Sequence, residues 1–194
     1  MSEVPLKLRF ATDSQWATVV LADFDTFLLD HAACERKASA MAISYVVRYP
    51  DRDAIHEPMI LLAREELAHF HRVFRLCQER GLRFAGDQKD LYVNGMLKAT
   101  RQGRDEEFLD RLVVAGVVEA RGHERFGCIA AALDEGPLKA FYAELTRSEA
   151  RHAEIFLELA ALYFPQDVIE ERLDALLDVD ADLCSRLPMR AALH

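Results

Sequence analysis

The sequence contains no apolar run of the length that crosses a membrane. A transmembrane helix needs about 20 consecutive apolar residues, and charged side chains interrupt every apolar stretch of this 194-residue chain. Residues 1–12 include Glu3 and no apolar segment of the signal-peptide type. These absences exclude a membrane-spanning protein and predict a cytoplasmic protein with no membrane partner.

Glycine, proline and cysteine are also scarce. With 8 Gly and 6 Pro, few positions interrupt regular structure, and the length fits one domain over residues 1–194. The four cysteines are far apart and form no C-x-x-C pair, so neither a disulfide framework nor a cysteine zinc site is expected. A net charge of -9 excludes a generally basic surface for nucleic-acid binding, but it allows a local basic patch.

Apolar residues recur at intervals of three and four, and the alternation typical of strands is nearly absent, so the fold class is all-α. Pro50, Gly81, the Gly136-Pro137 pair and Pro165 mark helix ends. The pattern predicts long helices over 15–49, 57–80, 105–133 and 137–163, an additional C-terminal helix over 165–187, and a short helix over 91–99.

Four long helices, each with one apolar stripe, are typical of a four-helix bundle. The links 50–56 and 134–136 are short, so the first and second helices, and the third and fourth, are expected to be antiparallel neighbours. The connection 81–104 is long, as a crossover between the second and third helices requires.

Each apolar stripe is interrupted by ionisable residues at core positions. An ionised carboxylate is too costly to bury alone, so it must be paired, protonated or bound to a metal. Four such carboxylates in one core favour a metal site. The interrupting residues are Glu35, Glu66, His69, Glu119, Glu149 and His152.

The spacing of these residues indicates two metal ions. Residues 66–69 and 149–152 both read Glu-x-x-His, and side chains three apart share one helix face. Each motif has a single core Glu about 30 residues upstream, which is the arrangement of carboxylate-bridged di-iron and di-manganese bundles. Four carboxylates balance two divalent cations, and oxygen and nitrogen donors suit iron or manganese. The alternative is that these residues occupy solvated helix faces.

His31 lies one helical turn before Glu35 on the same stripe. It could be a group just outside the metal ligands or one that lines a cavity, but a core histidine that is hydrogen-bonded to a neighbour is the favoured interpretation. His71 is expected at the surface, and His123 is expected to point mainly away from the ions.

At these residues the sequence resembles a family within the ferritin-like superfamily, the bacterial tRNA 2-methylthio-N6-isopentenyladenosine hydroxylases of the MiaE type. The similarity extends over about residues 20–165 and beyond the six candidate ligands. The segments that carry it are DHAACERKA from Asp30, EELAHF from Glu65, YVN from Tyr92, VEAR from Val118, ERF from Glu124, FYAEL from Phe141 and EARHAE from Glu149.

The resemblance implies a ferritin-like domain with a non-haem di-iron centre that uses dioxygen and two electrons from a reductase system. The substrate it implies is the isopentenyl group of the hypermodified adenosine beside the anticodon in tRNA. Glu35, Glu66, His69, Glu119, Glu149 and His152 would then be the iron ligands. Phe70, Phe126 and Leu145 are candidate walls of an apolar channel for the prenyl group, or simple core residues.

An anticodon stem-loop requires positive charge near the site, and the crossover together with Arg80 (residues 80–104) supplies six basic residues against two acidic ones. It is the candidate tRNA contact, with Tyr92 as a candidate stacking partner for an unpaired base; a solvated connection is the alternative. The residues concerned are Arg80, Arg83, Lys89, Tyr92, Lys98, Arg101 and Arg104.

Two other functions use the same features. A ferritin-like protein that oxidises and stores iron, or one that scavenges peroxide, could carry the same ligands, and a helical interaction protein could carry none. A large hollow assembly would indicate storage, whereas salt-dependent tRNA binding would indicate the hydroxylase. The sequence leaves the oligomeric state open.

Overall fold

The computed structural model describes residues 6–84 and 86–194. Within these residues the regular structure is entirely helical, which confirms the all-α prediction. No helix among them combines the length and apolar character of a membrane span. The helices are α1 (Trp16–Ala22), α2 (Phe24–Arg48), α3 (Asp53–Glu79), α4 (Leu91–Lys98), α5 (Arg104–Ala132), α6 (Pro137–Ala161) and α7 (Gln166–Arg186).

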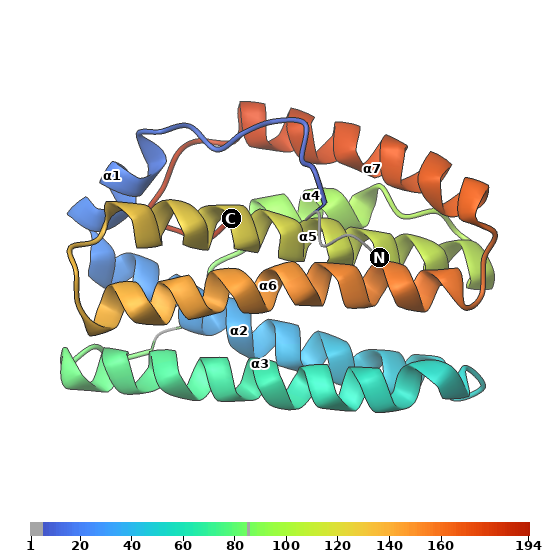
Figure 1. Ribbon diagram of the computed structural model, residues 1–194, viewed down its shortest axis with the longest axis horizontal. Coiled ribbons are helices and arrows are strands. Elements are labelled where there is room, and N and C mark those ends of the chain that lie inside the picture. Colours follow the sequence, from blue (N-terminus) through green and yellow to red (C-terminus); the bar gives the residue numbers. More distant parts are fainter. Residues whose placement is uncertain (1–5, 85) are drawn as a thin grey trace. The chain divides into compact units, whose positions relative to one another are not determined.

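The chain divides into two compact units. Among the described residues, the α2–α3 unit comprises 20–84, 86–88 and 190–193, and the α5–α6 unit comprises 6–19, 89–189 and 194. Each unit contains one pair of long helices that run antiparallel, α2 with α3 and α5 with α6 (Figure 1). The predicted pairing of neighbouring helices is therefore confirmed. The prediction of a single domain over 1–194 stays a prediction.

The helix predicted over 15–49 is divided at Asp23 into α1 and α2, and that prediction is wrong at this point. Asp23 leaves the helical conformation with φ -137°, and its carboxylate accepts a hydrogen bond from the Thr26 backbone N–H at 3.4 Å. An aspartate in this position stabilises a new helix start by about 1 kcal/mol. The local side chain thus outweighs the continuous apolar pattern.

α3 begins at Asp53, four residues before the predicted start, and Pro58 lies inside it. It ends as predicted before Gly81, whose φ of 71° lies in the left-handed region that glycine adopts without strain. The Leu82 backbone N–H then donates to the Cys77 carbonyl at 2.9 Å and closes the helix end.

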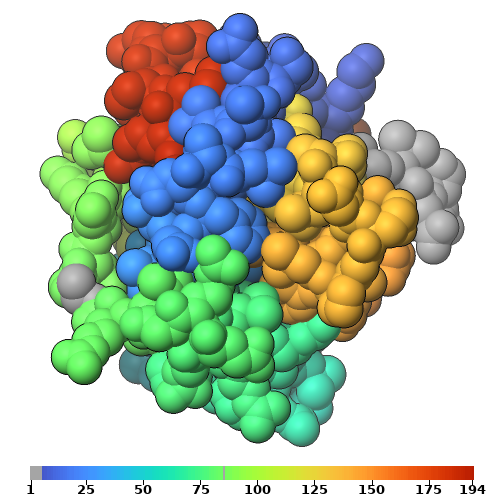
Figure 2. Space-filling view, turned by 90° about the vertical axis from the view of Figure 1, so that its left-hand side faces the viewer, coloured from blue at the N-terminus to red at the C-terminus, as the bar shows by residue number. Residues whose placement is uncertain are grey.

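Contacts along the full length hold α2 against α3. The Ser39 hydroxyl donates to the Ala63 carbonyl at 2.8 Å, and Arg80 Nε donates to Asp25 at 2.5 Å. The Arg80 guanidinium also lies over the Phe24 ring. In Figure 2 the end of α3 (green) adjoins the start of α2 (blue).

In the α5–α6 unit, α7 packs against α5 and α6, and α4 packs against α5 and α7 (Figure 1). A Cβ at Gly116 of α5 would lie 3.3 Å from the Ala153 carbonyl of α6, so glycine permits the close approach of these two helices. The core between them contains Leu112, Phe126, Ile129, Tyr142, Leu145 and Phe156. Burial of each such side chain contributes about 1.5–3 kcal/mol.

A buried carboxylate fixes the start of α5. Asp110 accepts the Arg101 backbone N–H at 2.6 Å, Arg101 Nη2 at 2.8 Å and Arg172 Nε of α7 at 2.6 Å. Burial raises the pKa of Asp110, but the hydrogen bonds from Arg101 and Arg172 outweigh it and lower the pKa below its ordinary value. This carboxylate therefore stabilises the fold at pH values above about 4, the ordinary aspartate pKa, and loses that contribution as pH falls through its lowered pKa.

We expect Asp110→Asn to lower the free energy of unfolding by roughly 3 kcal/mol at pH 7, because two guanidinium groups lose their charged partner. The difference from the parent should shrink as pH falls below about 4 and through the lowered pKa of Asp110, because the parent then loses the same charge. Urea unfolding over a series of pH values from 7 downward measures this. Asp134→Asn, at an exposed position in the α5–α6 turn, should change stability by less than about 0.5 kcal/mol. An equal loss of unfolding free energy in the Asp110 and Asp134 variants would contradict the stabilising role assigned to the Asp110 carboxylate.

Candidate metal centre

The α2–α3 unit brings three predicted ligands together. Glu35 comes from α2, and Glu66 and His69 come from adjacent turns of α3. One donor atom from each lies within 4.8 Å of the others. His69 Nδ1 is 3.6 Å from Glu35 Oε2 and 3.5 Å from Glu66 Oε2. All three side chains are buried, so α2 and α3 present two carboxylates and one imidazole at a common point.

His31 holds the Glu35 carboxylate from the opposite side. Its Nε2 lies 2.7 Å from Glu35 Oε1, and both groups are buried. His31 is therefore a core histidine that is hydrogen-bonded to a neighbour, and that neighbour is a candidate metal ligand. It restricts the rotation of the carboxylate and leaves Oε2 directed toward His69.

The electrostatics of this triad favour a cation. Burial lowers the pKa of His69, but the hydrogen bonds and charges of Glu35 and Glu66 outweigh it and raise the pKa to about 10. The two carboxylates thus stabilise positive charge at the position of the imidazole. A divalent cation binds such a site by displacing the proton.

The α5–α6 unit contains a second triad with the same composition. Donor atoms of Glu119 from α5 and of Glu149 and His152 from α6 lie within 4.8 Å of one another. His152 Nδ1 is 3.3 Å from Glu149 Oε2, and all three residues are buried. Gly122 lies beside this site, since a Cβ there would be 3.8 Å from Glu149 Cγ.

Ser148 is a neighbour of this triad that the sequence analysis missed. Its buried hydroxyl lies 3.4 Å from His152 Nε2 and can orient the imidazole. The serine directly precedes Glu149 in the Glu-x-x-His motif. A hydroxyl four residues before a candidate ligand on the same helix was the available signal.

The donor atoms of each triad fit a divalent metal of the iron or manganese type. Two carboxylates balance the charge of one divalent cation, and an imidazole adds a neutral nitrogen ligand. Neither triad contains a thiolate, which separates them from structural zinc sites. Buried carboxylates need compensating charge, and a divalent cation in each triad would supply it.

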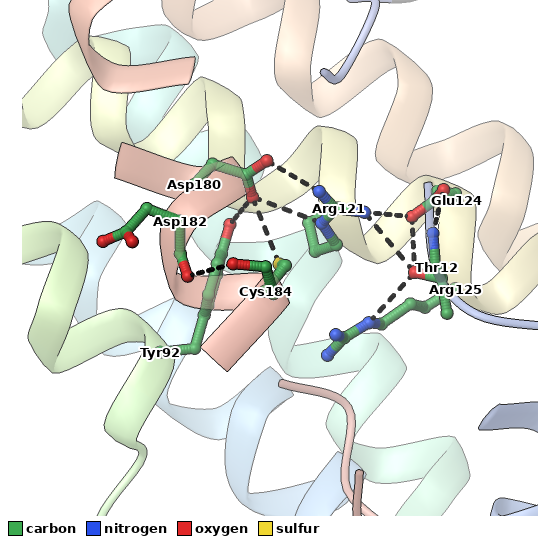
Figure 3. A network of polar contacts seen from close by, with 9 residues as sticks. Thr12, Tyr92, Arg121, Glu124, Arg125, Asp180, Asp182 and Cys184 are labelled. Carbon is green, nitrogen blue, oxygen red and sulfur yellow. Dashed lines mark hydrogen bonds and ion pairs between the residues drawn. The ribbon is translucent and has the colours of Figure 1, made fainter. Parts of the chain in front are cut away.

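A polar network in the α5–α6 unit connects α5 with α7 (Figure 3). Arg121 is fully buried and donates to Asp180 of α7 at 2.6 Å, and it also pairs with Glu124. The Tyr92 hydroxyl donates to the same Asp180 carboxylate at 2.7 Å. This network fixes α5 to α7 two residues after Glu119. The sequence analysis missed the burial of Arg121 and Asp180.

Tyr92 does not occupy the surface position predicted for it. Its side chain is only 1% exposed, its ring stacks on His194, and its hydroxyl belongs to the Asp180 network. Stacking on an unpaired base requires an exposed ring. The prediction of a base-stacking role is wrong for this residue, because an aromatic side chain at the start of a short amphipathic helix turns toward the core.

The predicted cationic residues of the crossover are all exposed. Two of them are engaged in ion pairs, Arg80 with Asp25 and Arg101 with Asp110. A structural role thus accounts for these two charges. Arg83, Lys89, Lys98 and Arg104 complete the set.

Comparison with known proteins identifies the relatives of this chain. The sequence profile of the family described as tRNA-(MS[2]IO[6]A)-hydroxylase (MiaE) matches residues 1–194. A Pseudomonas putida (strain KT2440) protein named tRNA 2-(methylsulfanyl)-N(6)-isopentenyladenosine(37) hydroxylase is 37% identical over 161 residues, which are 83% of this chain and 78% of the relative. A Salmonella typhimurium (strain LT2) protein of the same name is 40% identical over 125 residues, 64% of this chain and 46% of that protein.

Among solved structures, a Synechococcus protein described as having aldehyde deformylating oxygenase activity superimposes with a TM-score of 0.91. It is 32% identical, and the match covers 96% of this chain and 94% of that one. The predicted fold class, all-α and ferritin-like with a long crossover and an additional C-terminal helix, is confirmed. The profile match over the full length and the identity to the Pseudomonas protein together show that this chain belongs to the MiaE family of tRNA hydroxylases.

Proposed function

We propose that this chain is a dioxygen-dependent tRNA hydroxylase. Its substrate is the isopentenyl group of 2-methylthio-N6-isopentenyladenosine next to the anticodon. Membership of the family and the names of two curated relatives support this reaction. The observation that carries the proposal is the pair of buried triads with identical composition, Glu35 with Glu66 and His69, and Glu119 with Glu149 and His152.

In this proposal the two units form one ferritin-like domain over residues 1–194, and the two triads together hold two iron ions. When bound, the iron pair supplies the electrons that activate dioxygen for attack on an unactivated C–H bond. The four carboxylates would hold the two metals and neutralise their charge. His31 and Ser148 keep the ligands Glu35 and His152 in position.

Apolar side chains keep water away from the ligands. In the α5–α6 unit, Phe126 and Leu145 are buried on the same helices as Glu119 and Glu149, and the Phe126 ring packs on Tyr142. An apolar environment suits a prenyl group and protects a reactive oxidant from water. Phe70, the third predicted channel residue, is only half-buried, and we do not assign it to the channel.

The partners follow from the reaction. The tRNA binds as an anticodon stem-loop, and the exposed cations of the crossover supply phosphate contacts, above all Lys89 and Lys98 of the α5–α6 unit. An electron-donating reductase system completes each turnover. Because tRNA modification takes place where tRNA is used, we propose a cytoplasmic location. The storage and peroxide-scavenging alternatives share the ligands but not the family.

Deletion of the gene should remove the hydroxylated prenyl nucleoside from cellular tRNA and leave its unhydroxylated precursor in its place. Nucleoside analysis of digested tRNA by mass spectrometry measures both species, and expression of the wild-type chain should restore the product. Persistence of the hydroxylated nucleoside in the deletion strain would refute the proposed function.

Glu119→Ala should abolish most hydroxylation and reduce the iron bound per chain by about half or more, because removal of one carboxylate leaves its triad with excess positive charge. Iron analysis of the purified variant measures this directly. Glu106→Ala, an exposed position in the first turn of the same helix, should retain the iron content of the parent. Full iron occupancy in the Glu119 variant would remove this residue from the ligand set.

The double variant Lys89→Glu/Lys98→Glu should weaken tRNA binding and reduce the dependence of the affinity on salt, since each lost phosphate contact lowers the slope by about one. Filter binding at several salt concentrations measures both quantities. The control Lys139→Glu/Arg147→Glu carries the same charge change on α6 and should bind tRNA as the parent does. Equal affinities for the two variants would exclude the crossover from the tRNA interface.

A further inference from the structure

A groove of about 570 Å³ runs along the face of α3 that lies opposite the candidate metal ligands. Its lining residues recur every three or four positions and therefore share one side of the helix. They are Arg64, Leu67, Ala68, Phe70, His71 and Phe74. Glu66 and His69 point to the other side, where they are buried. One helix thus carries both a ligand pair and an external groove.

Several large apolar side chains in and around the groove are exposed to solvent, which is unusual for a solvated helix face. Leu61 is 50% exposed and Leu67 is 54% exposed. Phe74 stacks on Phe84 with the ring centres 5.6 Å apart, and Phe84 is itself 42% exposed. Contiguous exposed apolar surface of this kind marks a binding site.

The charges on this face are of one sign. Arg64 lines the groove, and Arg75 is exposed one residue after Phe74. The acids between residues 58 and 78 are Glu65 and the buried Glu66, whereas the chain as a whole carries a net charge of -9. A cationic rim around an apolar centre attracts a partner with an acidic surface and guides its approach.

The position of the groove relative to the ligands narrows the choice of partner. Leu67 follows Glu66 directly, and Ala68 and Phe70 flank His69. The groove and the ligands are separated by the thickness of one helix, about 10–12 Å including side chains. A nucleotide lying in the groove would face the wrong side of α3 to deliver its prenyl group. An electron needs only a short path through the helix.

We propose that the α3 groove is the docking surface for an acidic one-electron carrier protein that reduces the metal centre through α3. This inference rests on the proposed function. Hydroxylation places one oxygen atom of dioxygen in the product and the other in water, and it consumes two protons and two electrons from outside the chain. The carrier is oxidised by one electron in each of two encounters, and a small, partly apolar interface suits such brief contacts.

The test uses an acidic plant-type [2Fe–2S] ferredoxin as the probe and the double variant Arg64→Glu/Arg75→Glu. At low ionic strength, calorimetric titration of the metal-free full chain should show ferredoxin binding that weakens about tenfold or more in the variant. Anaerobic reduction of the iron-loaded chain by reduced ferredoxin should slow by a similar factor. Reduction by dithionite with methyl viologen should be unchanged, because a small reductant needs no docking surface.

The matched control is Lys89→Glu/Lys98→Glu, which makes the same charge change outside the groove. It should leave ferredoxin affinity within about twofold of the parent, while the groove variant should leave tRNA affinity unchanged. The proposal is overturned if ferredoxin does not bind the wild-type chain or if both variants lose equal affinity for it. It is also overturned if the groove variant loses affinity for tRNA instead, or if it alters the oligomeric state.

The same samples separate this proposal from the proposed function. Product formation by the wild-type chain, reduced by dithionite and then exposed to dioxygen, depends on the metal centre and the tRNA and needs no carrier protein. Its absence would refute the hydroxylase assignment. Its presence together with unaltered ferredoxin affinity in the groove variant would refute only the docking surface.

Discussion

The burial of negative charge is the constraint on which the structure depends. Each unit places two carboxylates and one imidazole in an apolar interior, at Glu35, Glu66 and His69 in one and at Glu119, Glu149 and His152 in the other. An uncompensated carboxylate in such surroundings costs several kcal/mol. In the α2–α3 unit the two carboxylates raise the pKa of His69 to about 10, so the imidazole keeps a proton whose positive charge compensates them. A metal cation would compensate the same negative charge, and in the proposed function it would also activate dioxygen.

Other parts of the α5–α6 unit serve to hold α5 in place around Glu119. Asp110, which precedes Glu119 along α5, binds Arg101 and Arg172. Arg121, which follows Glu119 along α5, binds Asp180 and Glu124. Both ion clusters connect α5 to α7, the second of them drawn in Figure 3, so the C-terminal helix acts as a support for the ligand-bearing helix. Gly116 lets α6 approach closely and brings Glu149 and His152 toward Glu119. A ligand fixed in this way needs little reorganisation when a metal binds.

The sequence predicts much of this arrangement because its main signals are local. Helix ends at Gly81 and Pro165 and the Glu-x-x-His spacing depend on a few neighbouring residues, and the structure has each of them. The division at Asp23 was missed because the apolar pattern continues through it. The burial of Arg121 and Tyr92 was missed for a different reason, since both depend on Asp180, which is remote in the chain. Periodicity shows which face of a helix is apolar. It does not show which acidic residue, remote in the sequence, will pair with a basic residue and allow that residue to be buried.

The central claim is that six side chains hold two metal ions in one protein chain. The most direct measurement is the metal content of chain purified after expression with iron, combined with Mössbauer spectroscopy of the iron-loaded protein. The account predicts about two irons per chain, and the proposed single di-iron centre predicts that the two irons are magnetically coupled. Iron that is absent, or present only as isolated and uncoupled ions, would contradict it.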